Sequence, residues 1–196
     1  MEPWTSTGRP AVRWTVAQVA GASVLSFQVF LRKAYGEGLY ERVLDRLPPE
    51  DAAPMRAILL PVNWYPTHPY VRALHVAREL TGDDEFFDRF GAFAADYQIN
   101  AFRRVLLRFA SPAFFLDRAG RLWARTHDTG TWEVEGGDRH VRGTLRDFAV
   151  VDADYCRVLV AWIHRASQLT GTRGETVHPA CRARGDEACV FEGWWE

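Results

Sequence analysis

Four side chains near the C-terminus are able to do chemistry together. The three cysteines of the chain are Cys156, Cys181 and Cys189, and His178 lies shortly before the second of them. Thiolate sulfur and imidazole nitrogen are donors that zinc prefers, and four of them close a tetrahedral structural site. Zinc held by these residues would tie separate elements of the chain together and contribute directly to folding.

A hairpin is predicted to bring two of the cysteines together. Residues 175–182 and 188–195 read as strands joined by a turn around Gly185-Asp186. That turn sets Cys181 and Cys189 opposite one another on adjacent strands, where their side chains share a face.

The remaining two donors come from a bulge and from a helix. A regular strand would send His178 to the other face, but Pro179 cannot join the hydrogen-bond ladder and favours a bulge that swings the histidine back. Cys156 lies in the first turn of a helix predicted at about 155–169, where the helix N-terminus favours a thiolate.

Two other interpretations of the cysteines stay open at this point. A cross-strand disulfide would join Cys181 to Cys189, or all three thiols would be buried as small apolar groups. An odd number of cysteines, with none in the first 155 residues, does not resemble a disulfide framework.

The rest of the chain is predicted to be mainly helical. Helices are expected at 21–36, 39–47, 51–60, 68–80, from Asp83 or Asp84 to about 102, and at 112–126; strands are expected at 131–135 and 141–150 around Gly136-Gly137. This order predicts an α+β domain in which helices pack on a small antiparallel sheet. We expect an N-terminal arm over residues 1–20 and one domain over residues 21–196.

Composition excludes several classes of function. The chain has 24 basic and 25 acidic residues, so no global field favours nucleic acid as a partner. The apolar stretch at 16–31 is too polar and too short to span a bilayer and fits the first helix better than a signal peptide. We therefore expect a cytoplasmic protein without a membrane span.

A family resemblance lies in residues 155–191. It is carried by Tyr155-Cys156, Trp162, Gly171, His178, Cys181, Ala183, Gly185-Asp186, Cys189 and Phe191. This run resembles the 4-vinyl reductase domain, in the form found in sensor modules of bacterial phenol-responsive activators. The resemblance implies a zinc ion held by three cysteines and a glutamate. His178 stands where that glutamate is expected, and Glu175 is the nearby substitute.

The resemblance also implies a fold shared with nitric-oxide-sensing haem domains and with Golgi-transport tethering subunits, in which helices and a sheet enclose a hydrophobic ligand cavity. Aromatic residues suited to line that cavity are Trp64, Tyr65, Phe90, Tyr97, Trp123, Trp132 and Trp162. The phenol sensors place a histidine on the long central helix, whereas this chain offers Gln98, Asn100 and Arg103 there. Phenol itself is therefore not the expected ligand.

Neither haem nor catalysis is favoured by the remaining motifs. His68, His75 and His164 lie on predicted helices but carry no specific flanking motif for an axial haem ligand. Nucleophile elbow, phosphate loop and dinucleotide fingerprint are all absent from the sequence. We do not expect an enzyme.

The sequence thus predicts a zinc-stabilised sensor domain. A small hydrophobic or aromatic ligand would enter the interior, and the signal would pass through a protein partner or a homodimer surface. The alternative is a scaffold or assembly module without a regulatory ligand, and a haem-binding sensor is the third interpretation.

Overall fold

The structure is a computed structural model that describes residues 17–99, 119–137, 139–171 and 173–196. Its first half is helical, with α1 (Gly21–Tyr35), α2 (Leu39–Arg46), α3 (Pro49–Arg56), α4 (Thr67–Thr81) and α5 (Phe86–Gln98). Its second half contains α8 (Ala119–Trp123), β3 (Thr131–Gly136), β4 (His140–Arg146), α9 (Ala153–Leu169), β5 (Gly174–Ala180), the 3₁₀ helix η1 (Arg182–Arg184) and β6 (Cys189–Trp195).

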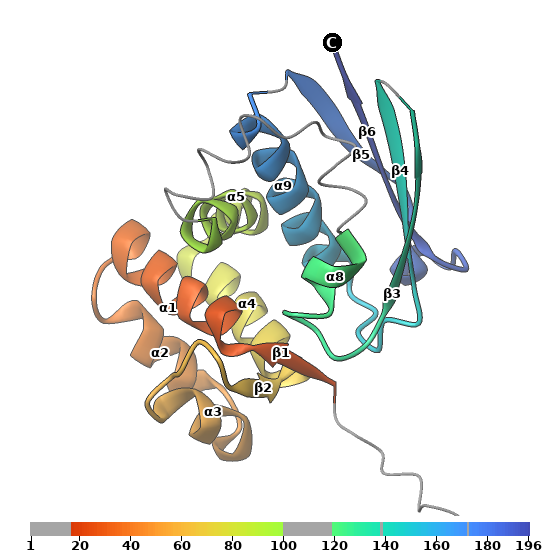
Figure 1. The fold of residues 1–196 in the computed structure, drawn as a ribbon. Helices are drawn as coiled ribbons and strands as arrows, with labels where there is room; N and C mark the ends of the chain where they lie inside the picture. The colour runs from red at the N-terminus through yellow and green to blue at the C-terminus, as the bar shows by residue number, and fades with distance from the viewer. Residues whose placement is uncertain (1–16, 100–118, 138, 172) are drawn as a thin grey trace, which may run out of the picture.

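The larger sheet has four strands in the order β3-β4-β6-β5, and every neighbouring pair is antiparallel. The helices α8 and α9 lie between this sheet and the N-terminal helices (Figure 1). The predicted fold class, α+β with helices packed on a small antiparallel sheet, is confirmed.

A second sheet of two short strands was missed. β1 (Gln18–Ala20) pairs antiparallel with β2 (Trp64–Pro66), so that Val19 lies opposite Tyr65. We expected β1 to belong to an N-terminal arm, and we expected no strand between the helices predicted at 51–60 and 68–80. Strands of three residues are too short to show the alternation of apolar and polar residues that predicts a strand. Residues 1–16 of the predicted arm lie outside the described residues.

The core of the helical half is aromatic. Phe27 and Phe30 of α1 contact Phe90 of α5, with ring centroids 5.6 and 5.4 Å apart, and Phe30 also meets Phe86 edge-on. All four rings are buried. Such ring contacts add to the free energy that burial of the apolar surface supplies.

α5 crosses α9 at very short range because of a glycine. A Cβ atom at Gly91 would lie 2.3 Å from the carbonyl oxygen of Val158 and 2.8 Å from Cβ of Ala161. The guanidinium of Arg165 on α9 binds both carboxylate oxygens of Asp96 on α5, at 3.0 and 3.1 Å. This crossing fixes α9 relative to the helical half.

Most predicted helices are present with shifted ends. The helix predicted at 51–60 runs instead from Pro49 to Arg56, and Ala57 is already extended. Of the helix predicted at 112–126, only α8 falls within the described residues. No helix in the described part of the chain is both long and apolar enough to cross a membrane.

Candidate metal centre

The four predicted donors meet in one place. Ligand atoms of Cys156, His178, Cys181 and Cys189 all lie within 4.8 Å of one another. The Cys156 sulfur is 3.7 Å from the Cys189 sulfur and 3.8 Å from the Cys181 sulfur. Sulfur atoms about 2.3 Å from one tetrahedral ion would be roughly 3.8 Å apart, so this spacing fits zinc. The three cysteines are free, which contradicts the disulfide alternative.

Cys156 is positioned by the start of α9. The helix is capped by Asp152, whose Oδ1 accepts the N–H of Tyr155 at 2.7 Å. This cap satisfies a backbone donor of the first turn and sets where the helix begins. Cys156 is the next residue, and its side chain is directed at the hairpin between β5 and β6.

The hairpin holds the other two sulfurs with a geometry that differs in detail from the prediction. Cys189 is the first residue of β6, but Cys181 follows the end of β5 and caps η1 instead of belonging to a strand. Gly185, at φ 97°, closes the turn after η1. Because Ala180 pairs with Val190, the next position in register still sets the two cysteines opposite one another.

His178 reaches the cluster through a bulge. The register of β5 against β6 shifts between Val177 and Ala180, on either side of Pro179, as the proline predicts. The imidazole stacks on Phe191 with centroids 4.6 Å apart and an interplanar angle of 11°. Its Nε2 is buried and has no hydrogen-bond partner among the described residues. A buried nitrogen without a partner is costly, and a metal ion would satisfy it.

Glu175, the other candidate for the fourth donor, lies elsewhere. It is exposed and pairs in register with Trp194, near the opposite end of the hairpin. Of these two candidates, only His178 has a ligand atom within 4.8 Å of the three sulfurs.

Backbone and side-chain contacts around the cluster hold the donors in place. Asp186 Oδ2 accepts the N–H of Cys181 at 2.7 Å, and the N–H of Arg182 donates to the Cys189 sulfur at 3.5 Å. Arg184 Nη2 donates to the carbonyl oxygen of His178 at 2.9 Å. Outer contacts of this kind orient metal ligands and tune their affinity.

The electrostatics of the cluster favour a thiolate. The hydrogen bond between the Cys156 and Cys189 sulfurs lowers the pKa of Cys189, and His178 and the N–H of Arg182 act in the same direction. The same contact, together with burial, raises the pKa of Cys156. A thiolate is the form of cysteine that binds metal.

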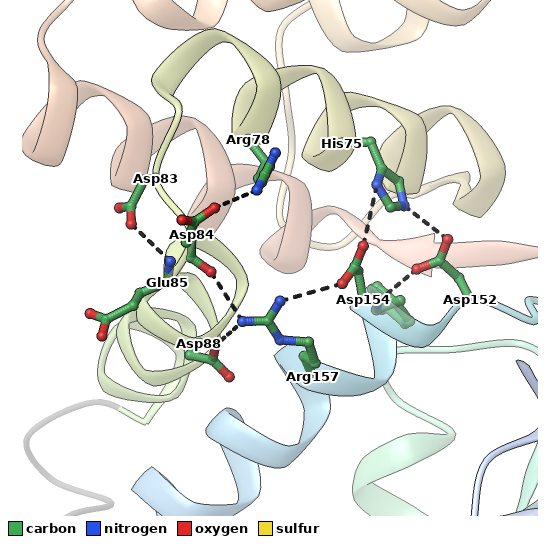
Figure 2. Close-up of polar contacts among 10 residues, drawn as sticks. His75, Arg78, Asp83, Asp84, Glu85, Asp88, Asp152, Asp154 and Arg157 are labelled. Carbon is green, nitrogen blue, oxygen red and sulfur yellow. Dashed lines mark hydrogen bonds and ion pairs between the residues drawn. The ribbon is translucent and has the colours of Figure 1, made fainter. Parts of the chain in front are cut away.

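A polar network fixes the first turn of α9 against α4 and α5 (Figure 2). His75 Nε2 lies 2.9 Å from Asp152 Oδ2, and its Nδ1 lies 3.7 Å from Asp154. Arg157 binds the carboxylates of Asp88 and Asp154, and it donates to the carbonyl oxygen of Asp84 at 3.2 Å. The residue that caps α9, and with it Cys156, is thus tied to the helical half.

The seven aromatic residues predicted to line a cavity are spread over several elements. Two lie on β2, Trp64 and Tyr65, and two lie on α5, Phe90 and Tyr97. The other three are Trp123 on α8, Trp132 on β3 and Trp162 on α9. Among these seven, which the structure describes in full, the one ring contact is Trp123 with Trp132, at 5.9 Å. Asn100 and Arg103 of the predicted central helix lie outside the described residues.

Individual members of this set have different surroundings. Tyr65 and Phe90 are buried, whereas Trp64 and Tyr97 are largely exposed. Trp123 is buried and donates through Nε1 to the carbonyl oxygen of Thr129 at 2.7 Å. The Trp162 indole N–H donates to the side chain of Gln98 at 3.1 Å.

The six histidines, all of which the structure describes, have different surroundings. Five are at least partly exposed: His68, His75, His140, His164 and His178. His127 is buried but lies 2.8 Å from the Tyr155 hydroxyl and stacks on Trp123 at 3.7 Å. His178 belongs to the sulfur cluster.

Comparison with known proteins identifies the fold. No protein-family model and no curated protein matches the chain. The Fe(II) unliganded H-NOX protein from K. algicida superposes with a TM-score of 0.69 and 9% identity, covering 90% of this chain and 96% of that chain. The chain has the H-NOX fold. An H-NOX protein from S. oneidensis in the Fe(II)NO state gives 0.69 and 10% identity over 90% and 99% of the two chains.

A third H-NOX structure, a Cs H-NOX mutant that contains 4-cyano-L-phenylalanine, matches with a TM-score of 0.64 and 13% identity over 90% of this chain and 96% of that one. These likenesses agree with the fold that the family resemblance implied. At such low identity they establish the fold alone.

Sequence reasoning missed the residues that support the metal ligands. Asp186 and Arg184 lie in the turn and were counted only as turn residues. The contact of His75 with Asp152 joins positions 77 apart in the chain. The single local signal is an acidic residue just before the predicted helix, Asp152, which caps α9.

Proposed function

We propose that this protein is a zinc-stabilised sensor domain of the 4-vinyl reductase type, which binds a small hydrophobic or aromatic molecule and acts through a protein partner or a homodimer. The observation that carries the proposal is the cluster of three sulfurs and one buried imidazole nitrogen within 4.8 Å, placed where α9 meets the β5–β6 hairpin of an H-NOX fold.

Zinc in this cluster would have a structural role. Cys156, His178, Cys181 and Cys189 would fill all four positions of a tetrahedral ion and leave none for a substrate. The ion would supply a cross-link between α9 and the hairpin. Thiolate ligands also need a reducing environment, which supports a cytoplasmic location.

Aromatic contacts connect the metal centre with the interior side of the sheet. His178 stacks on Phe191, whose ring lies 5.2 Å from Trp132, and Trp132 in turn contacts Trp123 at 5.9 Å. Gly143 leaves room for the Trp132 ring, because a Cβ there would lie 2.5 Å from the indole. A ligand that displaces Trp132 would therefore disturb Phe191, the ring on which the proposed metal ligand His178 stacks.

Native mass spectrometry combined with thermal melting tests this function. We expect one metal ion per chain and a rise in melting temperature with one class of small apolar compounds, because a ligand that binds only the folded state stabilises it. Trp132→Ala should abolish that rise while zinc stays bound, and Trp194→Ala, on a half-exposed ring of β6, should preserve it.

A scaffold module gives a different result. A chain that shows no rise across a broad set of compounds, while binding one defined protein partner, would contradict the sensor and support the assembly role.

A further inference from the structure

Four large apolar side chains stand out from the connection between α3 and β2. Ile58 is 87% exposed, Val62 81%, Leu60 46% and Trp64 41%. They occupy every second position of the loop. Between Arg56 and Arg72 the sequence contains no aspartate, glutamate, lysine or arginine. This connection lies on the helical side of the molecule, away from the four-stranded sheet (Figure 1).

The loop backbone is held firmly to the core. The N–H of Leu60 donates to the Tyr65 hydroxyl at 2.9 Å, and the carbonyl oxygen of Asn63 accepts from Gly21 at 2.7 Å. Gly21 is essential to this approach, because a Cβ at that position would lie 2.0 Å from the Leu60 carbonyl oxygen. The carbonyl oxygen of Pro61 also accepts from the start of α1, at 3.1 Å. The apolar side chains are thus displayed outward by an anchored backbone.

Shape and charge indicate what covers these side chains. Ile58 and Val62 protrude into solvent. Only surroundings that close around them on nearly all sides would bury them, as a fluid layer of acyl chains does. The cations on either side are neutralised: Arg56 pairs with Glu41 and Asp45, and Arg72 pairs with Asp51. The two arginines are thus already paired, and residues 57–71 contain no aspartate, glutamate, lysine or arginine that could pair with a protein partner.

The size of the patch argues against a second copy of the chain as its occupant. Four side chains expose a few hundred Å² at most, on the order of the largest patch of an ordinary monomer. A stable protein interface needs about 800 Å² on each partner.

We propose that the loop at 57–64 inserts into the interfacial region of a lipid bilayer, so that the domain sits on a membrane surface. Ile58 and Val62 would enter the acyl boundary, and Trp64 would lie at headgroup level, where tryptophan is favoured. Because residues 57–71 contain no aspartate, glutamate, lysine or arginine, the attraction is apolar and depends little on salt.

Co-sedimentation of the full chain with phosphatidylcholine vesicles tests this inference. We expect the protein to sediment with the vesicles at low and at high salt. The double variant Ile58→Ser/Val62→Ser should reduce the partition constant at least about tenfold, since burial of each lost methylene stabilises binding by about 0.8 kcal/mol. Val151→Ser removes a side chain that is 51% exposed before α9, and it should bind like the unmodified protein.

Three results would overturn the inference. The unmodified protein would stay in the supernatant, or Ile58→Ser/Val62→Ser would bind vesicles as well as Val151→Ser does. In the third case the unmodified protein would not bind vesicles, and light scattering would show a dimer that Ile58→Ser/Val62→Ser converts to a monomer. The occupant of the patch would then be a second copy of the chain. All three substitutions alter exposed side chains, and equal melting temperatures check that each variant is folded.

Discussion

At the scale of single residues, His178 would determine the charge of the proposed metal centre. Three thiolates and one neutral imidazole around Zn²⁺ would keep one negative charge in a buried site. The N–H of Arg182 directed at the Cys189 sulfur offsets part of that charge, and the Phe191 ring holds the imidazole in its plane. The centre is therefore built from donors and from the groups that orient them.

Substitution of the fourth donor separates the two candidates for that position. We expect His178→Ala to weaken zinc binding at least about tenfold, since even loss of an outer-shell contact costs a metal site 10- to 100-fold in affinity. Glu175→Ala is the matched control and should bind zinc normally, because Glu175 is exposed and lies far along the hairpin. Competition with a chromophoric chelator measures both constants. Weaker binding in Glu175→Ala alone would transfer the role to the glutamate.

At the scale of elements, α9 connects the N-terminal helices with the β5–β6 hairpin. Its first turn carries Cys156 and is tied through Asp152 to His75 of α4, while Gly91 of α5 packs against its middle. The sequence predicted α9 well because its apolar positions follow the helical period and an acidic residue caps it. The partners of α9 were not predictable, since no local pattern encodes contacts between positions so far apart.

Contact with Asp152 makes the α4–α9 junction sensitive to pH. The hydrogen bond to Asp152 raises the pKa of His75 above its ordinary value of 6.5. The folded state then holds its proton more tightly than the unfolded state, so the stabilisation is fully present below about pH 6.5 and is lost as the pH rises through the folded pKa. Asp154 and Glu79 act in the same direction as Asp152.

Urea unfolding of the unmodified protein and of His75→Gln, from about pH 5 to about pH 8, measures this effect. The difference in free energy of unfolding should be largest at the acid end and shrink toward the alkaline end. His127, whose pKa burial lowers to about 3, contributes the opposite slope in both proteins and cancels in the difference. A difference in free energy of unfolding that grows as the pH rises would contradict the predicted direction of the effect.

The close packing of α5 against α9 can be tested by substitution at Gly91. Gly91→Ala should destabilise the fold by about 1–3 kcal/mol, because the added methyl group meets the Val158 backbone and Ala161 without room to relax. Gly120→Ala on α8 is the control, since its Cβ would meet no atom closer than 3.8 Å. Chemical unfolding of the two variants compares them, and equal stabilities would show that the helices can move apart.

At the scale of the whole molecule, the fold is specified by pattern and not by sequence identity. Identities of 9 to 13% to H-NOX structures accompany TM-scores of 0.64 to 0.69. Helix periodicity was enough to predict the fold class, and the family resemblance in residues 155–191 implied the fold that the structure shows. The β1–β2 pair was not, because Val19 is held by Tyr65 and by a bridge to His127, contacts that only the folded chain creates.

Zinc would act at this scale as well, by joining α9 to the last hairpin and so to the sheet. X-ray absorption at the zinc edge, on protein purified without added metal, tests this most directly. We expect about one zinc ion per chain with three sulfur ligands and one nitrogen ligand. Protein that contains no zinc, with all three thiols freely titratable in the native state, would contradict the metal centre and the sensor built on it.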